Sequence, residues 1–464
     1  MLSYRDPTRR QFLSSTTAAA AGLGLSALPA LGAGLLRKAR RGAEKLQITH
    51  IETHNLYIPW HSFNDRDLFR YHGHRLRGRT ILVLHTNVGL VGLGDSWGIF
   101  EVTDEHKKRY LGASPLDFLG SRSDLFFNMA IYDLVGKYLD VPAWKLLGQQ
   151  VRQRIPVAAW TCSLRPEMMA KEIQQAASLG YRWLKYHVDQ VQNVADQARA
   201  MQAVAPAGFR VHLDFNMNSP LEHIDPVLQE LKSYPVIGRI EDPIGADRPQ
   251  DWQYLCQKYD WPILSHHAPS DFMVKGYADG HMAGHAPIGE AIQVAAIARH
   301  VGKPIMLQQC GGYINQAFLA HEASVFDMAT IDHVNLAELW TDQVVKQAMP
   351  ITDGTIGVPD GPGLGVTLDW EKLRQLKQIP RPDYEPFLVR IKYQDGPVIL
   401  ARHDASQPGQ TDVMRFIGRL LGDNAPGPPP RYNNRVHTDW MEPDAAGFGK
   451  WWDATRQWKW VVVD

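Results

Sequence analysis

The sequence has little cysteine and no excess of charge of either sign. Its 464 residues include three cysteines, Cys162, Cys256 and Cys310, which lie far apart. Three dispersed thiols argue against a disulfide framework or a thiolate zinc site and are typical of small buried residues. Lysine plus arginine and aspartate plus glutamate number 49 each. This balance argues against nucleic acid or an anionic membrane surface as a partner and favours a small-molecule ligand.

Apart from the N-terminal segment, the sequence has no long apolar run. No other segment has the roughly 20 apolar residues that are needed to span a bilayer. At the N-terminus, TRRQFLSS (Thr8–Ser15) places two arginines before an Ala- and Gly-rich run ending near Leu36. This pattern predicts a twin-arginine-type export signal within residues 1–45, and hence the periplasm or cell envelope. A short anchor or a disordered arm is the alternative, and the basic RKARR that follows leaves the cleavage site open.

Residues 46–150 predict a small α+β capping domain. The stretches ITHIETHNLYIP and TILVLHTNVGLVGLGDS read as antiparallel strands, with a turn at 87–89. The segment SDLFFNMAIYDLVGKYLDVPAWKLLG then has helical spacing. Between the two strand regions, residues 60–79 are polar, aromatic and basic, which predicts either a mobile flap or a solvated loop.

Residues 151–350 alternate between short apolar segments and amphipathic ones. Repeated strand–helix units predict a parallel (β/α) barrel, a modified TIM barrel of the α/β class, whose active site lies at the C-terminal ends of the strands. One helix, between Ala268 and Gly280, is expected to be stunted. The strand candidates are RWLKYHV, FRVHLDFN, GRIEDP, WPILSHH, GHMAGHAP, KPIMLQQ and HVNLAEL, with PVAAWTCS as a further one.

The remainder of the chain forms two more segments. Residues 351–380, containing VPDGPGLGVTLD, are expected to return to the capping domain, and residues 381–464 form a C-terminal extension. So much tryptophan in the extension argues against disorder and for docking, with a subunit interface as one candidate place, so we expect a homo-oligomer. The tryptophans are Trp440, Trp451, Trp452, Trp458 and Trp460.

Three potential metal ligands end successive strand candidates. Asp214, Glu241 and His267 are 27 and 26 residues apart, which is about one strand–helix repeat. In a barrel their side chains would converge at one side of the mouth and share a cation. Lys185 and His187 lie one strand earlier and, being two residues apart, point to the same face. They are the candidate bases.

Two adjacent histidines follow the strand candidate WPILSHH. Neighbouring strand residues point to opposite faces, so His267 is expected to face the site and His266 the surrounding helices or a neighbouring loop. Two carboxylates and an imidazole make a softer ligand set than three carboxylates. This shifts the expected metal from Mg²⁺ toward Mn²⁺, Fe²⁺ or Zn²⁺.

From Leu46 to Asp369 the sequence resembles the enolase superfamily, in its mandelate racemase and muconate lactonizing branch. The matching pieces are AIYDLVGKYLDVPAWKLLG, LGYRWLKYHV with Lys-x-His in place of Lys-x-Lys, LDFN, IEDP and VPDGPGLGVTLD. The resemblance implies one divalent metal and abstraction of a proton alpha to a carboxylate, with a Lys or His base. It also implies that Glu338, on the eighth strand, binds the substrate carboxylate.

The site diverges from the family pattern. His267 stands where relatives have a third carboxylate, and Gln308 stands where racemase-type relatives have a histidine. His281 and His285 occupy the strand where cycloisomerase-type relatives have a lysine, and their shared parity would let both enter the mouth as acid, base or ligand. Asn216 and Gln308 are candidate substrate contacts. Asn216 is also a typical turn residue.

The sequence therefore predicts an exported, metal-dependent lyase or isomerase acting on a hydroxy acid, most plausibly a sugar-acid dehydratase. Dehydration is favoured because opposed bases are missing while histidines can serve as acids for a leaving hydroxyl. Arg70, Arg75 or Arg77 of the flap would meet the distal end of the substrate. The alternatives are a racemase or cycloisomerase, a hydrolytic or redox enzyme, and a barrel without chemistry that binds a sugar or a partner.

Overall fold

The computed structural model describes residues 46–69, 77–188, 193–217, 219–383, 385–394, 396–403, 436–458 and 460–463. The predicted export signal, residues 1–45, lies outside these ranges. From Gln47 onward the chain forms one compact unit. Within the described residues, every helix is too short or too polar to cross a bilayer.

The capping domain contains a three-stranded antiparallel sheet, β1 (Ile48–Leu56), β2 (Arg79–Thr86) and β3 (Val91–Trp97), in that order. Gly89 takes a positive φ of 78° in the predicted turn between β2 and β3, a conformation in which glycine carries no Cβ penalty. Helix α5 (Leu125–Leu139) packs its aromatic start against buried leucines of β2. The cap also contains α4 (Asp104–Tyr110), η2 (Pro115–Phe118) and α6 (Trp144–Leu147).

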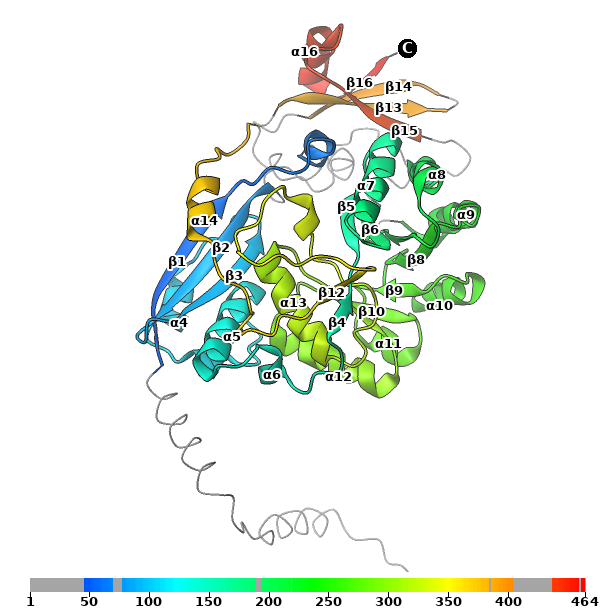
Figure 1. Cartoon of the computed structure of the whole chain (residues 1–464). Coiled ribbons are helices and arrows are strands. Elements are labelled where there is room, and N and C mark those ends of the chain that lie inside the picture. The colour runs from blue at the N-terminus through cyan, green and yellow to red at the C-terminus, as the bar shows by residue number, and fades with distance from the viewer. Residues whose placement is uncertain are drawn as a thin grey trace, which may run out of the picture. The chain divides into compact units, whose positions relative to one another are not determined.

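Seven parallel strands form the barrel sheet in the order of the sequence, which confirms the predicted parallel barrel with an α+β cap (Figure 1). The strands are β5 (Ala159–Cys162), β6 (Trp183–His187), β7 (Arg210–Asp214), β8 (Ile237–Glu241), β9 (Ile263–Ser265), β10 (Gly280–Gly284) and β11 (Ile305–Gln308). The helices that connect or follow them are α7 (Pro166–Ser178), α8 (Val194–Val204), α9 (Leu221–Leu231), α10 (Pro249–Lys258), α11 (Asp271–Lys275), α12 (Ile288–Val301) and α13 (Tyr313–Val325).

The predicted stunted helix is confirmed, since α11 has only five residues and ends at Gly276 in a left-handed conformation. The predicted strand HVNLAEL is wrong in part. His333 and Val334 make isolated parallel bridges to Val157 and Gln308, which close the ring, but the chain then turns into the 3-10 helix η4 (Ala337–Leu339). The reason is Asn335, whose side chain bonds nearby backbone groups and so replaces the strand ladder.

The segment after the barrel makes hydrogen bonds with the cap. Strand β12 (Thr355–Gly357) pairs with β4 (Arg154–Pro156), Gly363 accepts a hydrogen bond from the amide of Ala143, and α14 (Trp370–Leu376) follows. Leu364 donates its amide to the buried carboxylate of Asp133 on α5. These bonds fix the segment to β4 and to the cap.

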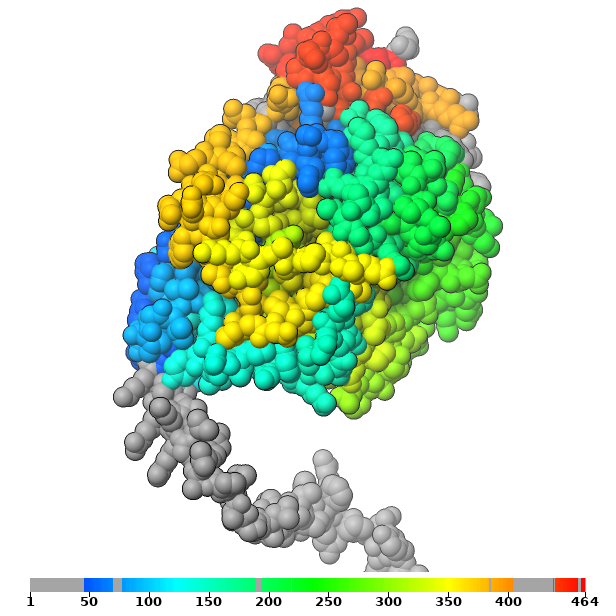
Figure 2. Space-filling view, in the orientation of Figure 1, coloured from blue at the N-terminus to red at the C-terminus, as the bar shows by residue number. Residues whose placement is uncertain are grey.

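The C-terminal extension is a four-stranded antiparallel sheet in the order β15-β13-β14-β16, with the helix α16 (Phe448–Trp458) (Figure 1). Its strands are β13 (Phe387–Tyr393), β14 (Val398–His403), β15 (Val436–Met441) and β16 (Trp460–Val463). Alternate residues separate the two faces, because Phe387 and Val389 join the main core while Leu388 packs with α16. The extension therefore docks on its own chain, beside the blue segment that includes Arg66 (Figure 2).

The predicted flap, residues 60–79, is described at its two ends only. Trp60 bridges to Trp340, Asn64 donates to the buried Glu172 of α7, and Arg77 forms an ion pair with Asp65. These contacts anchor both ends of the segment. Its His72, His74, Arg70 and Arg75 lie outside the described residues.

Candidate metal and acid–base site

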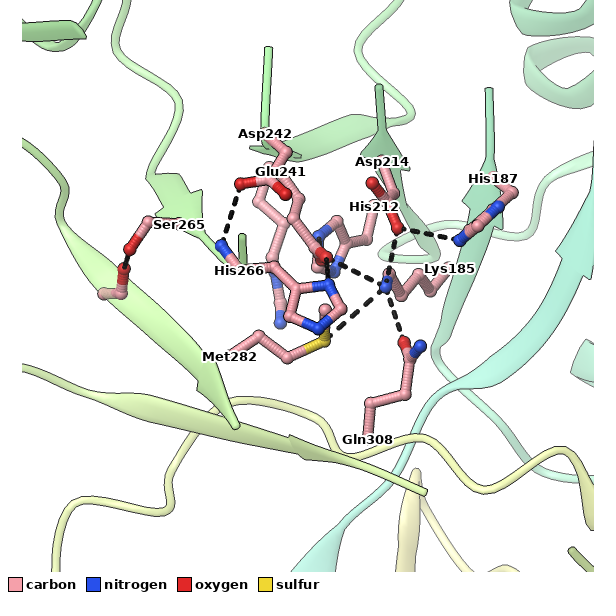
Figure 3. Close-up of polar contacts among 12 residues, drawn as sticks. Lys185, His187, His212, Asp214, Glu241, Asp242, Ser265, His266, Met282 and Gln308 are labelled. Atoms are coloured by element: carbon pink, nitrogen blue, oxygen red, sulfur yellow. Dashed lines mark hydrogen bonds and ion pairs between the residues drawn. The ribbon is translucent and has the colours of Figure 1, made fainter. Parts of the chain in front are cut away.

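Lys185, near the end of β6, lies at the centre of the site (Figure 3). Its ammonium is 3.0 Å from Asp214 Oδ2 and 3.1 Å from Glu241 Oε1, and all three side chains are fully buried. Gln308 Oε1, from β11, is 2.5 Å from the same nitrogen. The sulfur of Met282 lies 3.6 Å away. The strand-end spacing thus brings together Lys185, Asp214 and Glu241, with the cation seated between two carboxylates.

His187 follows Lys185 by two residues and faces the same carboxylate. Its Nε2 is 3.2 Å from Asp214 Oδ2, and 9% of its side chain is exposed whereas that of Lys185 is fully buried. Asn216 donates its backbone amide to Asp214 Oδ1 at 3.0 Å and has a positive φ of 51°. Asn216 therefore forms the turn that orients Asp214, and its substrate contact stays a prediction.

His212, two residues before Asp214 on β7, was not singled out from the sequence. Its Nε2 lies 2.9 Å from Glu241 Oε2, and both side chains are buried. Burial lowers the pKa of His212 to about 4 despite the neighbouring carboxylate. The imidazole is therefore neutral near pH 7. His212 and Asp214 are two residues apart on one strand and therefore point to the same face, and this spacing could have identified His212 from the sequence.

The expected separation of His266 and His267 is wrong. Strand β9 ends at Ser265, so the alternation of a strand does not extend to these residues, and their rings lie side by side with centroids 4.0 Å apart. His266 Nδ1 is 3.5 Å from Glu241 Oε1, whereas His267 Nδ1 contacts Asp242 Oδ2 at 2.5 Å. Half of the His267 side chain is exposed.

Asp242 organises this loop and was also missed. Its carboxylate accepts the backbone amides of His266 at 2.8 Å and His267 at 3.1 Å, as well as the His267 ring. That ring hydrogen bond raises the pKa of His267. The acidic residue after Glu241 in IEDP was the available signal, but nothing in the sequence shows that its carboxylate would accept three hydrogen bonds.

Two groups of potential ligands exist among the residues that the structure describes. Oxygens of Asp214, Glu241 and Asp242 lie within 4.8 Å of one another, as do ligand atoms of Asp242, His266 and His267. The predicted set of Asp214, Glu241 and His267 is not one of these groups. Asp242 rather than His267 joins the first two carboxylates, and ligation by His267 stays a prediction.

The donors fit a divalent cation. Asp214 Oδ2 and Glu241 Oε2 are buried and accept no hydrogen bond of good geometry from the described residues, although Lys185 and His212 lie close to them. Buried carboxylate oxygens in this state are suitable ligands for a hard cation. Asp242 already accepts three hydrogen bonds, so Asp214 and Glu241 are the more available pair.

The ion pairs outweigh burial in setting the charges. Burial would raise the pKa of Asp214, but Lys185 and His187 hold it well below its usual range. Burial and Asp214 likewise oppose ionisation of Glu241, yet Lys185 and His212 lower its pKa. Burial opposes the charge on Lys185, but the two carboxylates raise its pKa. Its role as a base stays a prediction.

His281 and His285 do not share a face as expected. His281 lies within β10, is buried, and contacts Ser265 Oγ at 2.9 Å through Nδ1, while burial lowers its pKa to about 4. His285 lies beyond the strand with a positive φ of 52°. Its ring turns toward Trp97, with centroids 5.7 Å apart, because the left-handed residue breaks the strand parity.

Glu338 belongs to η4 rather than to a strand. Its carboxylate accepts the amide of Trp160 at 2.5 Å and the hydroxyl of Tyr181 at 3.3 Å. Burial raises its pKa to about 7. No contact joins it to Lys185 or Asp214 in the described part of the chain, so binding of a substrate carboxylate by Glu338 stays a prediction.

Comparison with known proteins identifies the barrel. Residues 168–372 match the model of the family described as Enolase C-terminal domain-like. This match covers less than half of the chain, and over these residues the barrel is similar to that family. Solved proteins of the mandelate racemase and muconate lactonizing branch share this fold, in agreement with the resemblance seen in the sequence.

The individual proteins that this chain resembles are distant. A D-galactonate dehydratase from Xanthomonas axonopodis pv. citri is 26% identical over 300 residues, which cover 58% of this chain and 77% of the relative. The muconate lactonizing enzyme from Pseudomonas fluorescens, solved with muconolactone, has a TM-score of 0.60 at 21% identity and covers 72% of this chain and 99% of its own. The dipeptide epimerase from Cytophaga hutchinsonii, complexed with Mg and a dipeptide, has a TM-score of 0.58 at 18% identity, with coverage of 71% and 98%.

Proposed function

We propose that this protein is a metal-dependent lyase that abstracts a proton alpha to a carboxylate and dehydrates a sugar acid. The observation that carries the proposal is the set of buried carboxylates on adjacent parallel strands, Asp214, Glu241 and Asp242, with Lys185 and His187 on the strand before them. The similarity to D-galactonate dehydratases supports the substrate class. The Mg bound to a solved relative supports the metal.

Asp214 and Glu241 would hold the divalent cation, with Asp242 or His266 as a further ligand. The cation would supply the positive charge that a carboxylate needs when the carbon beside it loses a proton. The ammonium of Lys185 forms an ion pair with Asp214 and hydrogen bonds with Glu241 and Gln308. We therefore assign it a positioning role, in which its charge fixes both carboxylates.

His187 is the better-placed base, because its ring lies at the strand end and is slightly exposed. It would take the proton from the α-carbon, and the electron pair left behind would expel the β-hydroxyl. The departing hydroxyl needs a proton, for which His267 is half-exposed on the neighbouring loop. Loss of water then leaves an enol that tautomerises to a 2-keto-3-deoxy acid.

Isotope exchange tests the proposal directly. Protein loaded with Mg²⁺ or Mn²⁺ is incubated with a panel of sugar acids in deuterated water, and the substrates and products are followed by NMR. We expect a keto acid labelled with deuterium, loss of activity in His187→Gln and Asp214→Asn, and unchanged activity in the control His300→Gln, which is exposed on α12. Bound metal without exchange would favour the non-catalytic barrel. Exchange without loss of water would favour a racemase.

We also propose that the N-terminal segment directs export. The support is the TRRQFLSS pattern of the sequence.

A further inference from the structure

A cavity of about 500 Å³ lies between the capping domain and the barrel. The cap contributes Trp97 and Phe100, from the end of β3 and the loop after it, together with parts of α4 and the start of α5. The barrel contributes His285 and Cys310, which follow β10 and β11. The volume is in the range of small-molecule binding pockets.

Hydrogen bonds link the wall of this cavity to the acid–base site. His285 donates its amide to the carbonyl of Gln308 at 2.7 Å, and the side chain of Gln308 contacts the ammonium of Lys185. One residue therefore separates the cavity wall from the centre of the site. A non-glycine residue with positive φ, such as His285 at 52°, is costly and is often found where a side chain must point in a functional direction.

The lining suits a polyhydroxylated acid. Trp97 and Phe100 offer aromatic faces to the C–H groups of a sugar chain, and polar groups lie between them. Most acidic groups of the lining are already paired, since Asp95 binds Arg79 at 2.6 Å and Asp124 binds His106 at 3.1 Å. The remaining polar and charged lining residues are Ser96, Glu105, Arg109, Arg122, Ser123 and Asn315.

Arg122 differs from the other arginines near the mouth. It has neither an ion pair nor a hydrogen bond with any residue in the described ranges, whereas Arg77 and Arg79 are paired with Asp65 and Asp95. Its stem lies over Gly289 at the start of α12, where a Cβ would be 3.1 Å from Arg122 Cγ. The same Cβ would collide first with the backbone carbonyl of Gly120, so Gly289 is required by the backbone rather than by Arg122. Arg122 is an exposed residue that lines the cavity without a counter-ion among the described residues.

We propose that this cavity receives the far end of the substrate and that Arg122 selects sugar acids carrying a second anionic group there. The inference rests on the proposed function and specifies its substrate class. A guanidinium binds a carboxylate or a phosphate through paired hydrogen bonds, so both sources of negative charge fit. Arg122 is a binding residue in this scheme, because the reacting carbon lies at the other end of the substrate.

Three probe substrates distinguish the sources of charge: galactarate with a second carboxylate, 6-phosphogluconate with a phosphate, and galactonate with a neutral far end. We measure kcat/KM and calorimetric Kd for the full protein and for Arg122→Gln, Arg122→Lys and the exposed control Arg374→Gln. We expect one of the two dianions to bind about tenfold more tightly than galactonate, as a charge-assisted hydrogen bond provides. The better dianion identifies the group.

In Arg122→Gln this preference should fall to about twofold, while Arg122→Lys retains part of it and Arg374→Gln all of it. Equal affinity for all three acids, or a preference that survives Arg122→Gln, would overturn the inference. If galactonate is dehydrated and Arg122→Gln changes nothing, the inference fails and the proposed function stands. If the dianions bind through Arg122 but no acid exchanges its α-hydrogen, the proposed function fails instead.

Discussion

Single residues decide the charge balance of the site. Asp214 and Glu241 were predicted from a spacing of one strand–helix repeat, and the structure brings them together because equivalent strand ends meet at one rim of a parallel barrel. The orientation of His266 and His267 could not be predicted, because it depends on where β9 ends and on three hydrogen bonds to Asp242. Such bonds form between segments and leave no periodic signal.

Replacing Lys185 by methionine should destabilise the metal-free protein by about 3–5 kcal/mol, since two buried carboxylates would lose their counter-charge. Added Mn²⁺ should restore part of this loss, because a cation between the carboxylates replaces the ammonium. Denaturant unfolding with chelator and with Mn²⁺ measures both effects. The control is Lys107→Met, which removes an exposed pair with Asp104 and should cost well under about 1 kcal/mol. Equal losses in the two variants would contradict the role of Lys185.

Glu322 makes stability depend on pH. Burial raises its pKa to about 8, although Gln309 donates a hydrogen bond to it. The folded state therefore holds the proton more tightly than the unfolded chain, where the pKa is about 4.3. The stabilisation of the folded state by this tighter proton binding is complete below about pH 4 and is lost as the pH rises toward 8.

Glu322→Gln mimics the protonated acid, so it should remove this loss. The unfolding free energy of the variant minus that of the native protein should increase by about 2 kcal/mol when the pH is raised from 6 to 8.5. Urea unfolding at the two pH values measures the gain. The same gain in Glu371→Gln, an exposed residue of α14, would show that the effect does not come from burial.

At the scale of elements, the barrel strands and the cap helix were predictable from their apolar patterns, but the pairing of the extension was not. Two of its three strand pairings join residues distant in sequence, since β13 pairs with β15 and β14 pairs with β16. A tryptophan-rich composition predicts docking without saying against which surface. The prediction of an eighth strand was wrong in part for a local reason, because the side chain of Asn335 replaces the hydrogen bonds of a strand ladder.

Trp440 reports on the docking of this extension. It is 7% exposed, packs at an angle against Phe387, and lies under the guanidinium of Arg165 from α7. Trp440→Ala should therefore lower the free energy of unfolding by about 3–5 kcal/mol. Trp451→Ala, at a half-buried residue of α16, is the control and should cost clearly less. Chemical denaturation of both variants decides whether the sheet is part of the cooperative core.

At the scale of the whole molecule, the balanced charge depends on the N-terminal segment. Without residues 1–45, 41 basic and 47 acidic residues remain. If the segment is removed on export, the mature protein should be shorter and more acidic than the full chain, whose pI is 7.3. Cell fractionation with isoelectric focusing checks this expectation.

Arg9→Lys together with Arg10→Lys should keep the full-length form in the cytoplasm, because the twin arginines carry the signal. The paired change Arg40→Lys with Arg41→Lys conserves charge in the same way and should be exported normally. Export of the first double variant would contradict the signal.

The placement of Lys185 separates folding of the chain from loading of its site. Proteins whose carboxylate cages contain only repelling charges collapse when a chelator strips the ion. Here the lysine serves as a resident counter-ion for Asp214 and Glu241, so the empty protein has no such repulsion to relieve. The proposed metal would then be needed for activity and not for folding.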